Sequence, residues 1–295
     1  MVGPLDFQEG AGARHRVAHG AASALCSGFA PMNTPLNDET DFESALRFSC
    51  TSCGKCCNGL RLLLSLSEAV SWLEHGGRVE LLCDAAPDMP FPEGSGEAYR
   101  AARAVPATSH ALPVTVAVLL TAVFDGPCPN LQADMLCGAY DRRPNACRIY
   151  PAEIRPDRAI TPAEKLCPPD AWDSHQPVFD HPVTGITDSV TAIAIVGARA
   201  AGIDDVGRKA RLLALLGIDQ AALANEGYAV WKPETARLLE ALRIVLDGAS
   251  EGESEPVHVR IVSPREETRR MIVEADGADA EPDPAGGYAY LPLYA

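Results

Sequence analysis

The chain has 295 residues, and its 47% apolar content is sufficient to build a packed globular core. The formal net charge of −15 argues against a nucleic-acid partner, because phosphate backbones are bound by clustered Lys and Arg. No stretch reaches the roughly 18 uncharged apolar residues of a membrane helix, so no membrane partner is expected either.

The N-terminal residues differ in composition from the rest of the chain. We expect residues 1–41 to be a disordered extension, and the change from an Ala, Gly, Arg and His rich stretch suggests Met32 as the true start. Residues 1–31 show no clear secretory signal. Together with ten cysteines, which the cytosol keeps reduced, this favours a cytoplasmic protein that uses its thiols as ligands.

Residues 42–181 are expected to form a cysteine-cluster, metal-binding domain. Within it, the apolar run Leu60 to Leu66 predicts a buried strand, followed by a helix over Glu68 to His75 that Ser65 or Ser67 caps. The helix should end at the glycine pair that follows it.

Three further segments complete this domain. Residues 84–110 are rich in Pro, Gly and Ala with little periodicity, which indicates a loop or an insertion. Val114 to Phe124 is dominated by β-branched and other apolar residues, so we expect a strand that ends in a turn. Cys128 to Asp170 is rich in Pro and Arg, and we expect it to be held in shape by its ligands.

The remainder of the chain divides into a helical region, residues 182–248, and an acidic tail, residues 249–295. The tail should be mostly disordered or form a small hairpin from Val257 to Val262 and Arg270 to Val273. The predicted fold class is α+β, with a small loop-rich cysteine region and short strands followed by a helical C-terminal region. The expected helices are Asp188 to Ala201, Asp204 to Leu216 with Gly217 as its stop, Asp219 to Glu226 and Pro233 to Asp247. One apolar stripe is expected on the last of these helices, formed by Leu238, Leu239, Leu242, Val245 and Leu246.

A dense run of cysteines is the strongest chemical signal in the sequence. Cys50, Cys53 and Cys56 recur every three residues, and Cys57 follows at once. A tight turn with small residues brings two such sulfurs to the separation that a tetrahedral ion or a cluster corner requires. Gly54 supplies a permissive backbone for that turn.

Adjacent cysteines seldom bind one ion together, because successive side chains point in different directions. We therefore expect Cys56 and Cys57 to serve two sites. Cys26 and Cys83 are expected to be small buried hydrophobes or surface thiols. The total of eight candidates suggests two four-thiolate sites, or one cluster with one reactive or zinc-bound set. The downstream candidates are Cys128, Cys137, Cys147 and Cys167.

The spacing leaves the metal open between iron and zinc. A Cys-x2-Cys-x2-Cys run begins the bacterial ferredoxin pattern, whose remote cysteine precedes a proline as in Cys128-Pro129 and Cys167-Pro168, and this favours an iron-sulfur cluster. Zinc is the alternative, because paired Cys-x2-Cys elements are equally its signature. Disulfides are disfavoured by the tightness of the run. Positive groups should offset the thiolate charge, and the candidates are Lys55, Arg142, Arg143 and Arg148.

Three blocks resemble one known family: Phe48 to Cys57, Cys128 to Leu131, and Cys137 to Pro151, with Cys167-Pro168 as a later match. They are similar to the YkgJ-type cysteine cluster family, described as zinc- or iron-chelating proteins. The resemblance covers about residues 45–170 and places Arg143, Pro144 and Arg148 in the matched motif without a role. It implies as metal ligands Cys50, Cys53, Cys56, Cys57, Cys128, Cys137, Cys147 and Cys167.

Three functions follow as hypotheses. The first is a cytosolic metal-binding protein whose first half unfolds when the metal is removed. The second rests on similar cysteine blocks in bacterial flagellin lysine-N-methylases, and implies an S-adenosylmethionine-dependent protein methyltransferase with a protein substrate and with Tyr140 or Tyr150 near the substrate nitrogen. The chain lacks the Gly-rich turn of common methyltransferase nucleotide sites. The third is a redox or electron-transfer protein in which Cys57 reacts.

Overall fold

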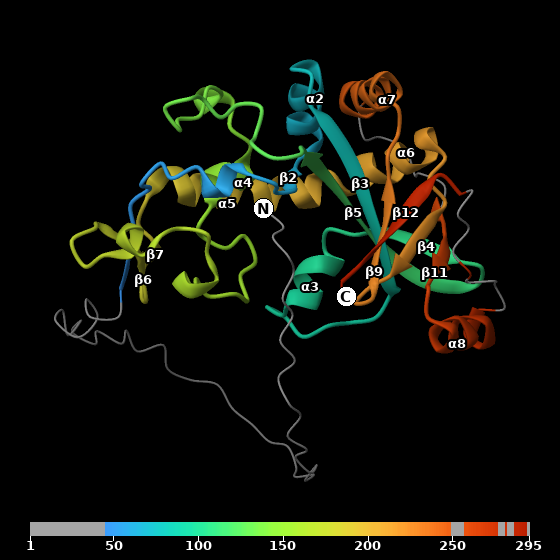
Figure 1. The fold of residues 1–295 in the computed structure, drawn as a ribbon. Helices are drawn as coiled ribbons and strands as arrows, with labels where there is room; N and C mark the ends of the chain where they lie inside the picture. The colour runs from blue at the N-terminus through green and yellow to red at the C-terminus, as the bar shows by residue number, and fades with distance from the viewer. Residues whose placement is uncertain (1–44, 249–256, 277–280, 282–285, 294–295) are drawn as a thin grey trace, which may run out of the picture.

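Two long strands form the centre of the computed structural model, which describes residues 45–248, 257–276, 281 and 286–293. β3 (Arg78–Pro87) and β5 (Leu112–Val123) pair antiparallel over ten residues of each strand (Figure 1). Residues 79–85 of β3 are all buried, because the strand is covered on both faces. The sequence around β5 is Val rich for the same reason.

Seven further strands extend this pair into a nine-stranded sheet. They are β2 (Leu62–Leu64), β4 (Val105–Ser109), β8 (Gln220–Leu223), β9 (Gly227–Trp231), β10 (Val257–His258), β11 (Arg260–Val262) and β12 (Tyr288–Pro292). β5 pairs antiparallel with β4 and β2, and the other edge of β3 pairs with β8 and β9. β10 runs parallel to β4, β11 runs parallel to β8, and β12 runs antiparallel to β9. The sheet therefore contains strands from both halves of the chain.

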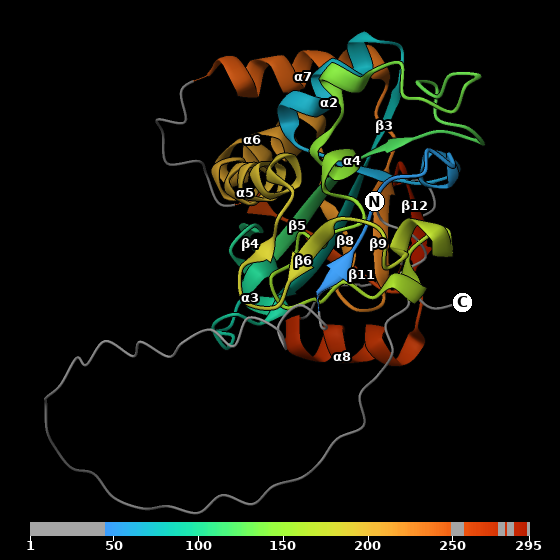
Figure 2. The same cartoon turned by 90° about the vertical axis from the view of Figure 1, so that its left-hand side faces the viewer.

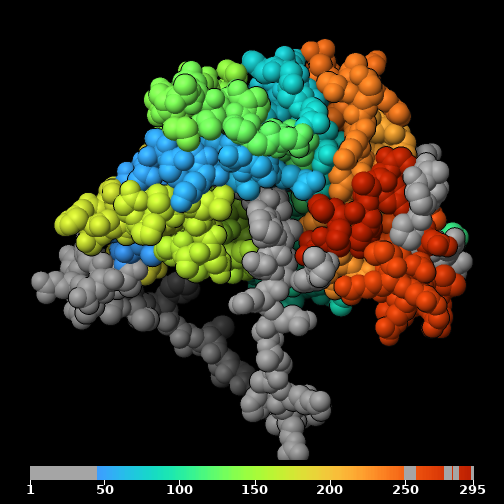
Figure 3. Space-filling view, in the orientation of Figure 1, coloured from blue at the N-terminus to red at the C-terminus, as the bar shows by residue number. Residues whose placement is uncertain are grey.

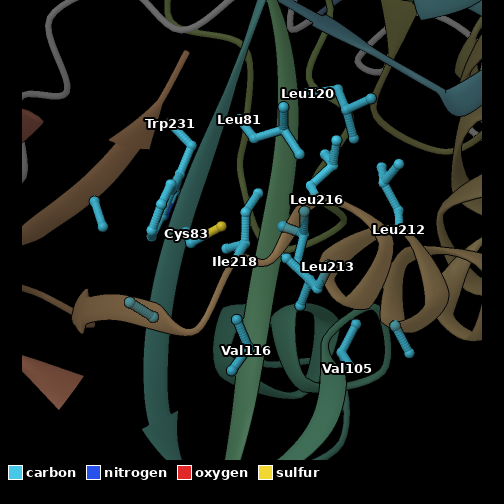
Figure 4. Close-up of a cluster of buried hydrophobic side chains, with 14 of the residues drawn as sticks. Leu81, Cys83, Val105, Val116, Leu120, Leu212, Leu213, Leu216, Ile218 and Trp231 are labelled. Carbon is cyan, nitrogen blue, oxygen red and sulfur yellow. The ribbon is translucent and has the colours of Figure 1, made fainter. Parts of the chain in front are cut away.

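Helices cover the sheet and supply much of the main core. α2 (Leu66–Glu74), α6 (Val206–Leu216) and α7 (Thr235–Asp247) pack on one another and on the sheet (Figure 2). The apolar stripe predicted for α7 is buried at Leu238, Leu242 and Val245. Figure 4 shows how side chains of β3, β5 and α6 meet in this core. The remaining helices are α3 (Gly96–Ala101), α4 (Asn145–Ile149), α5 (Ser189–Asp204) and α8 (Glu266–Asp276).

A second, smaller unit packs beside the main sheet. It contains a three-stranded sheet of β1 (Leu46–Arg47), β6 (Val178–His181) and β7 (Gly185–Ile186). Phe48 and Trp172 pack against its buried residues, with ring centroids 4.8 Å apart. Much of the connecting chain is loop or short 3-10 turn, so the α+β class with a loop-rich cysteine region and a helix-containing C-terminal part is confirmed.

Three sequence predictions for secondary structure are wrong. Residues 84–110 are not a loop, because they contain the end of β3, α3 and β4. Asp219 to Glu226 is not helical: β8 lies between β3 and β11, and this pairing overrides a weak local preference. Val257 to Val262 and Arg270 to Val273 do not form a hairpin, because the first segment joins the main sheet and the second lies in α8.

Several local predictions are confirmed. β2 lies within the predicted strand, and Ser65 caps α2 through a capping box with Glu68. Gly217 ends α6 with φ 67°, as expected of a left-handed C-terminal residue. The proposals for residues 1–41 and for Met32 lie outside the described residues.

Among the helices of the described residues, none is both long and apolar enough to cross a membrane.

Candidate metal centre

The eight candidate thiols lie on loops and short turns at one side of the central sheet. Their segments are residues 50–57, 128–147 and 167, and Figure 3 shows these parts of the chain side by side on one face of the molecule. Regular structure is scarce here. The first block ends in a 3-10 turn, Lys55–Cys57, which Gly54 enters with φ 69°. That left-handed conformation is the permissive backbone expected at this position.

Cys56 and Cys57 are adjacent thiols whose cysteine neighbours differ in part. Their sulfurs are 3.9 Å apart, and a hydrogen bond between them raises the pKa of Cys56 and lowers that of Cys57 to about 6. Beyond Cys57, the charges of Cys50 and Cys147 also raise the pKa of Cys56. Cys57 lies close to Cys128, because its backbone carbonyl accepts a hydrogen bond from the Cys128 N–H.

The first set, which we name the core-side group, is Cys57, Cys128, Cys137 and Cys147. An extension of the β2 and β5 pairing assembles its first two members: Asn58 bridges to Pro127, and the Cys128 N–H donates to the Cys57 carbonyl at 2.7 Å. Leu131 then bridges to Cys137, which returns the chain to the turn that begins at Cys128.

Cys147 completes the core-side group from helix α4. Burial, and then the charges of Cys128 and Cys57, raise its pKa to about 12. Cys128 and Cys147 both pack against the main hydrophobic core. Burial also raises the pKa of Cys128, and the charges of Cys57 and Cys137 add to this shift. Like charges raise one another's pKa only when they are near, so these four thiols share one neighbourhood.

The second set, which we name the outer group, is Cys50, Cys53, Cys56 and Cys167. The Ser49 N–H donates to the Ala171 carbonyl at 3.0 Å, which holds the first cysteine block against the segment that follows Cys167. Burial raises the pKa of Cys167, and the charges of Cys53 and Cys50 raise it further. Cys50 is exposed, whereas no member of the core-side group is.

Tyr150 supports the outer group through contacts of its hydroxyl. Its Oη accepts a hydrogen bond from the Leu166 N–H at 2.6 Å. The same hydroxyl hydrogen-bonds the Cys167 thiol, which lowers the pKa of Cys167 against the larger opposing effect of burial. Tyr150 therefore positions one thiol, while Tyr140 is exposed with the Arg143 guanidinium 4.2 Å from its ring centroid.

Arg143 supports the core-side group. Burial would lower its pKa, but a hydrogen bond to Cys137 and the charges of Cys137, Tyr140 and Cys147 raise it overall. Arg143 also helps to lower the pKa of Cys57, after the larger effect of the Cys56 hydrogen bond. A guanidinium in this position offsets the negative charge of clustered thiolates.

The other predicted positive groups have different contacts. Arg148 donates to the Arg143 carbonyl at 3.0 Å and to the Asp141 carbonyl at 2.8 Å, so it braces the loop and not a thiol. Arg142 lies 3.4 Å from the Asn130 side-chain oxygen. Lys55 is exposed in the turn of the first block.

Of the two remaining cysteines, Cys83 lies apart from both groups, and Cys26 lies outside the described residues. Cys83 is 1% exposed on β3, and Figure 4 shows its sulfur among Leu81, Ile218 and Trp231. Burial raises its pKa, as expected of a thiol that serves as a small core residue. The buried-hydrophobe interpretation is confirmed for Cys83, while Cys26 lies outside the described residues.

A pocket of about 310 Å³ lies between α2 and the Cys128 loop. Trp72 and Phe124 contribute aromatic rings, and Pro127 and Pro129 flank the thiol. Neither Tyr140 nor Tyr150, the tyrosines considered for a methyltransferase, is among its lining residues.

The eight candidate thiols lie in one region, but their sulfurs are not positioned around a common metal position. All nine cysteines of the described residues are free, so no disulfide competes for them there. Within the same residues, no group of three or more His, Cys, Asp or Glu side chains is arranged to hold a metal ion as it stands. Clustered thiolates repel one another, which opposes their closest approach unless a cation compensates them.

Comparison with known families agrees with this set of cysteines. Residues 49–168 match the model of the CxxCxxCC family, described as "Putative zinc- or iron-chelating domain". We refer to these residues as the CxxCxxCC segment. The match begins one residue before Cys50 and ends one residue after Cys167, so the CxxCxxCC segment includes all eight candidate ligands. The predicted choice of zinc or iron agrees with the family description. Searches of curated proteins and of solved structures found no match to the chain.

Proposed function

We propose that the CxxCxxCC segment is a metal-binding unit with two four-thiolate centres, one formed by the core-side group and one by the outer group. The observation that carries this proposal is a pair of backbone contacts: the Cys128 N–H donates to the Cys57 carbonyl, whereas the Ser49 N–H donates to the Ala171 carbonyl and holds the first cysteine block against the segment that follows Cys167. Eight thiols divided in this way provide two complete ligand sets, as tetrahedral zinc and cubane iron-sulfur centres both require.

The donor set fits zinc or iron better than a hard cation. Each group consists of thiols alone, and soft sulfur ligands select zinc and iron-sulfur centres over magnesium or calcium. Most of the thiols lie on loops and short turns, so they can come closer together without a change in the central sheet. A bound tetrathiolate zinc would stabilise the fold, whereas an iron-sulfur centre would also carry electrons.

Different residues of the chain would position the ligands of such centres and offset their charge. The β2 and β5 extension fixes Cys57 beside Cys128, and α4 presents Cys147 to them from the core. Arg143 offsets negative charge at the core-side group. Tyr150 orients Cys167 in the outer group through its hydroxyl. Each thiol that binds a metal gives up its proton, so binding should release acid and depend on pH.

Metal counting tests the two-centre arrangement. The full chain, purified without oxygen, is analysed for zinc, iron and labile sulfide, together with its visible spectrum. We expect Cys53→Ser and Cys137→Ser each to remove about half of the bound metal, because each change opens one four-ligand site. Cys83→Ala, at a thiol buried in the main core apart from both groups, is the control and should retain the full content. Loss of all metal from both variants would indicate one shared centre, and metal-free wild-type protein would refute the function.

A thiol redox switch is the second candidate, favoured by the lowered pKa of Cys57. The Cys56 hydrogen bond brings the pKa of Cys57 to about 6, and a thiolate at neutral pH is the reactive form of cysteine. Alkylation of metal-loaded protein at neutral pH separates the two functions. A ligated Cys57 should be protected, whereas a switch requires Cys57 to be modified before the other cysteines.

A further inference from the structure

We propose that the two centres have unequal roles: the core-side group keeps its metal as a permanent structural centre, whereas the outer group is an exchangeable site that accepts and releases a thiophilic divalent cation. This inference rests on the proposed function and adds the fate of the metal at each group. The cation at the outer group would be cargo, and its acceptor would be a thiol-bearing molecule.

The core-side group is built into the sheet and the main core. Cys128 and Cys147 contact that core directly. Cys57 and Cys128 are joined by the backbone ladder that continues from β2 and β5. Glu68, in the first turn of α2, also accepts a hydrogen bond from the Asn145 N–H at the start of α4, the helix of Cys147. Opening this group would disturb packed secondary structure, which should make metal release slow.

The outer group has weaker anchors. Cys50 is exposed, and residues 48–54 contain no helix or strand. Cys167 follows a short 3-10 turn, Pro162–Glu164, and precedes another, Pro169–Trp172. Leu166, beside Cys167, is 43% exposed. A competing thiol could therefore reach this group from solvent without opening the main core, and an exposed sulfur is the first requirement for ligand exchange.

Charge compensation also differs between the groups. The core-side thiols have the guanidinium of Arg143 in hydrogen-bond contact with Cys137. At the outer group, Tyr150 provides a neutral hydroxyl, and the nearby Lys165 ammonium is already paired with the Glu153 carboxylate. A four-thiolate divalent centre carries a net charge of −2, so it should be held more tightly beside Arg143.

The exchange step is balanced without any oxidant. Each bond from an outer-group sulfur to the cation that breaks is replaced by a bond from an acceptor thiolate to the same cation. The proton that the acceptor thiol loses passes to the released cysteine, so no electron changes hands.

A chelator experiment on the full-length protein tests the inference. Protein loaded with zinc is mixed with an excess of a chromophoric zinc chelator, and release is followed by absorbance. We expect two phases of equal amplitude. Cys50→Ser should abolish the fast phase and leave the slow one, while Cys83→Ala, in the main core, should change neither. Removal of the slow phase by Cys50→Ser, or release of all zinc in one phase from a chain that binds two ions, would overturn the inference and leave the proposed function intact.

A charge variant provides a second test that leaves every cysteine in place and so does not depend on whether the cysteine variants fold. Arg143→Gln should weaken zinc binding at the core-side group about 10- to 100-fold, as changes around metal ligands commonly do, and accelerate only the slow phase. Arg142→Gln is the matched control, because the neighbouring Arg142 contacts Asn130 and no cysteine. An effect of Arg143→Gln confined to the fast phase would contradict the assignment. A wild-type chain that binds no zinc or iron would refute the proposed function itself.

Discussion

Glu68 and Asn145 join the helix that packs on the sheet to the helix that carries a candidate ligand. Oε1 of Glu68 accepts the Asn145 N–H at 2.6 Å, while Oε2 accepts the Ser65 N–H at 2.8 Å within the capping box of α2. One carboxylate thus satisfies free backbone donors at two helix N-termini. Through α4, it couples the stability of the main core to the position of Cys147.

Removal of this carboxylate should be costly. We expect Glu68→Ala to lower the free energy of unfolding by about 1 to 3 kcal/mol, because it removes a cap and leaves donors without their partner. Urea unfolding at neutral pH measures this change. Glu74→Ala is the control at the other end of α2, where Glu74 makes an exposed ion pair with Arg243, and it should cost about 0 to 1 kcal/mol. Equal losses in the two variants would contradict a special role for Glu68.

Loss of the Tyr150 hydroxyl should affect metal binding more than folding. Tyr150→Phe keeps the ring but removes the group that accepts from Leu166 and bonds Cys167. We expect the metal affinity of the outer group to fall by about tenfold or more, with a loss of about 1 kcal/mol in stability. Competition with a chelator of known affinity measures the first effect. Tyr140→Phe, at an exposed ring, should leave affinity unchanged, and a matching decrease there would argue against the hydrogen bond.

Lys209 should give a stability difference that depends on pH. It is 8% exposed, and burial lowers its pKa below the ordinary 10.5 although Asp205 opposes this shift. The protonated amine therefore costs folding free energy at neutral pH, and the cost disappears as pH rises from the lowered pKa past 10.5. We expect Lys209→Met to be more stable than wild type at pH 7 and to lose this advantage toward pH 10.

Denaturant midpoints of both proteins across this pH range test the prediction. Lys232→Met is a suitable control, because the Lys232 side chain is exposed, although its ammonium pairs with the largely buried Glu80. Its effect should show little of this pH dependence. A Lys209→Met variant that is less stable than wild type at pH 7 would mean that the Asp205 interaction outweighs burial.

Metal removal should loosen the cysteine loops and spare the central sheet. The sequence predicted that the whole first half would unfold without metal. However, β3 and β5 lie between the cysteine blocks and belong to the main core, so we expect residues 78–123 to keep their protection. Hydrogen exchange with and without a chelator should show faster exchange mainly in residues 48–58 and 125–170. Uniform loss of protection across β3 and β5 would contradict this division.

The sequence predicted features whose cause is local. The capping box of α2, the Gly217 stop and the apolar stripe of α7 each depend on residues within a few positions of one another. β8 and β11 could not be predicted in this way, because each is a short segment whose strand state comes from pairing with distant chain. The part of the chain after the last cysteine therefore contains strands where helix or hairpin was expected.

The candidate site shows the same contrast. Spacing alone indicated the eight thiols, and the adjacency of Cys56 and Cys57 indicated two sets. The assignment of each downstream cysteine to a set needs the extension of β2 and β5 and the contact of Ser49 with Ala171. The contacts of Tyr150 and Glu68 also join residues far apart in sequence, and no periodicity or spacing reveals them.

The continuation of the β2 and β5 pairing beyond its own strands links strand registration to sulfur geometry. Cys57 meets Cys128 because Asn58 lies opposite Pro127 on that ladder. A chain in which β2 had slipped along β5 would carry every required cysteine and still present its sulfurs to the wrong neighbours. Retention of the ion at the core-side group would then distinguish chains with the correct strand register from chains with a shifted one.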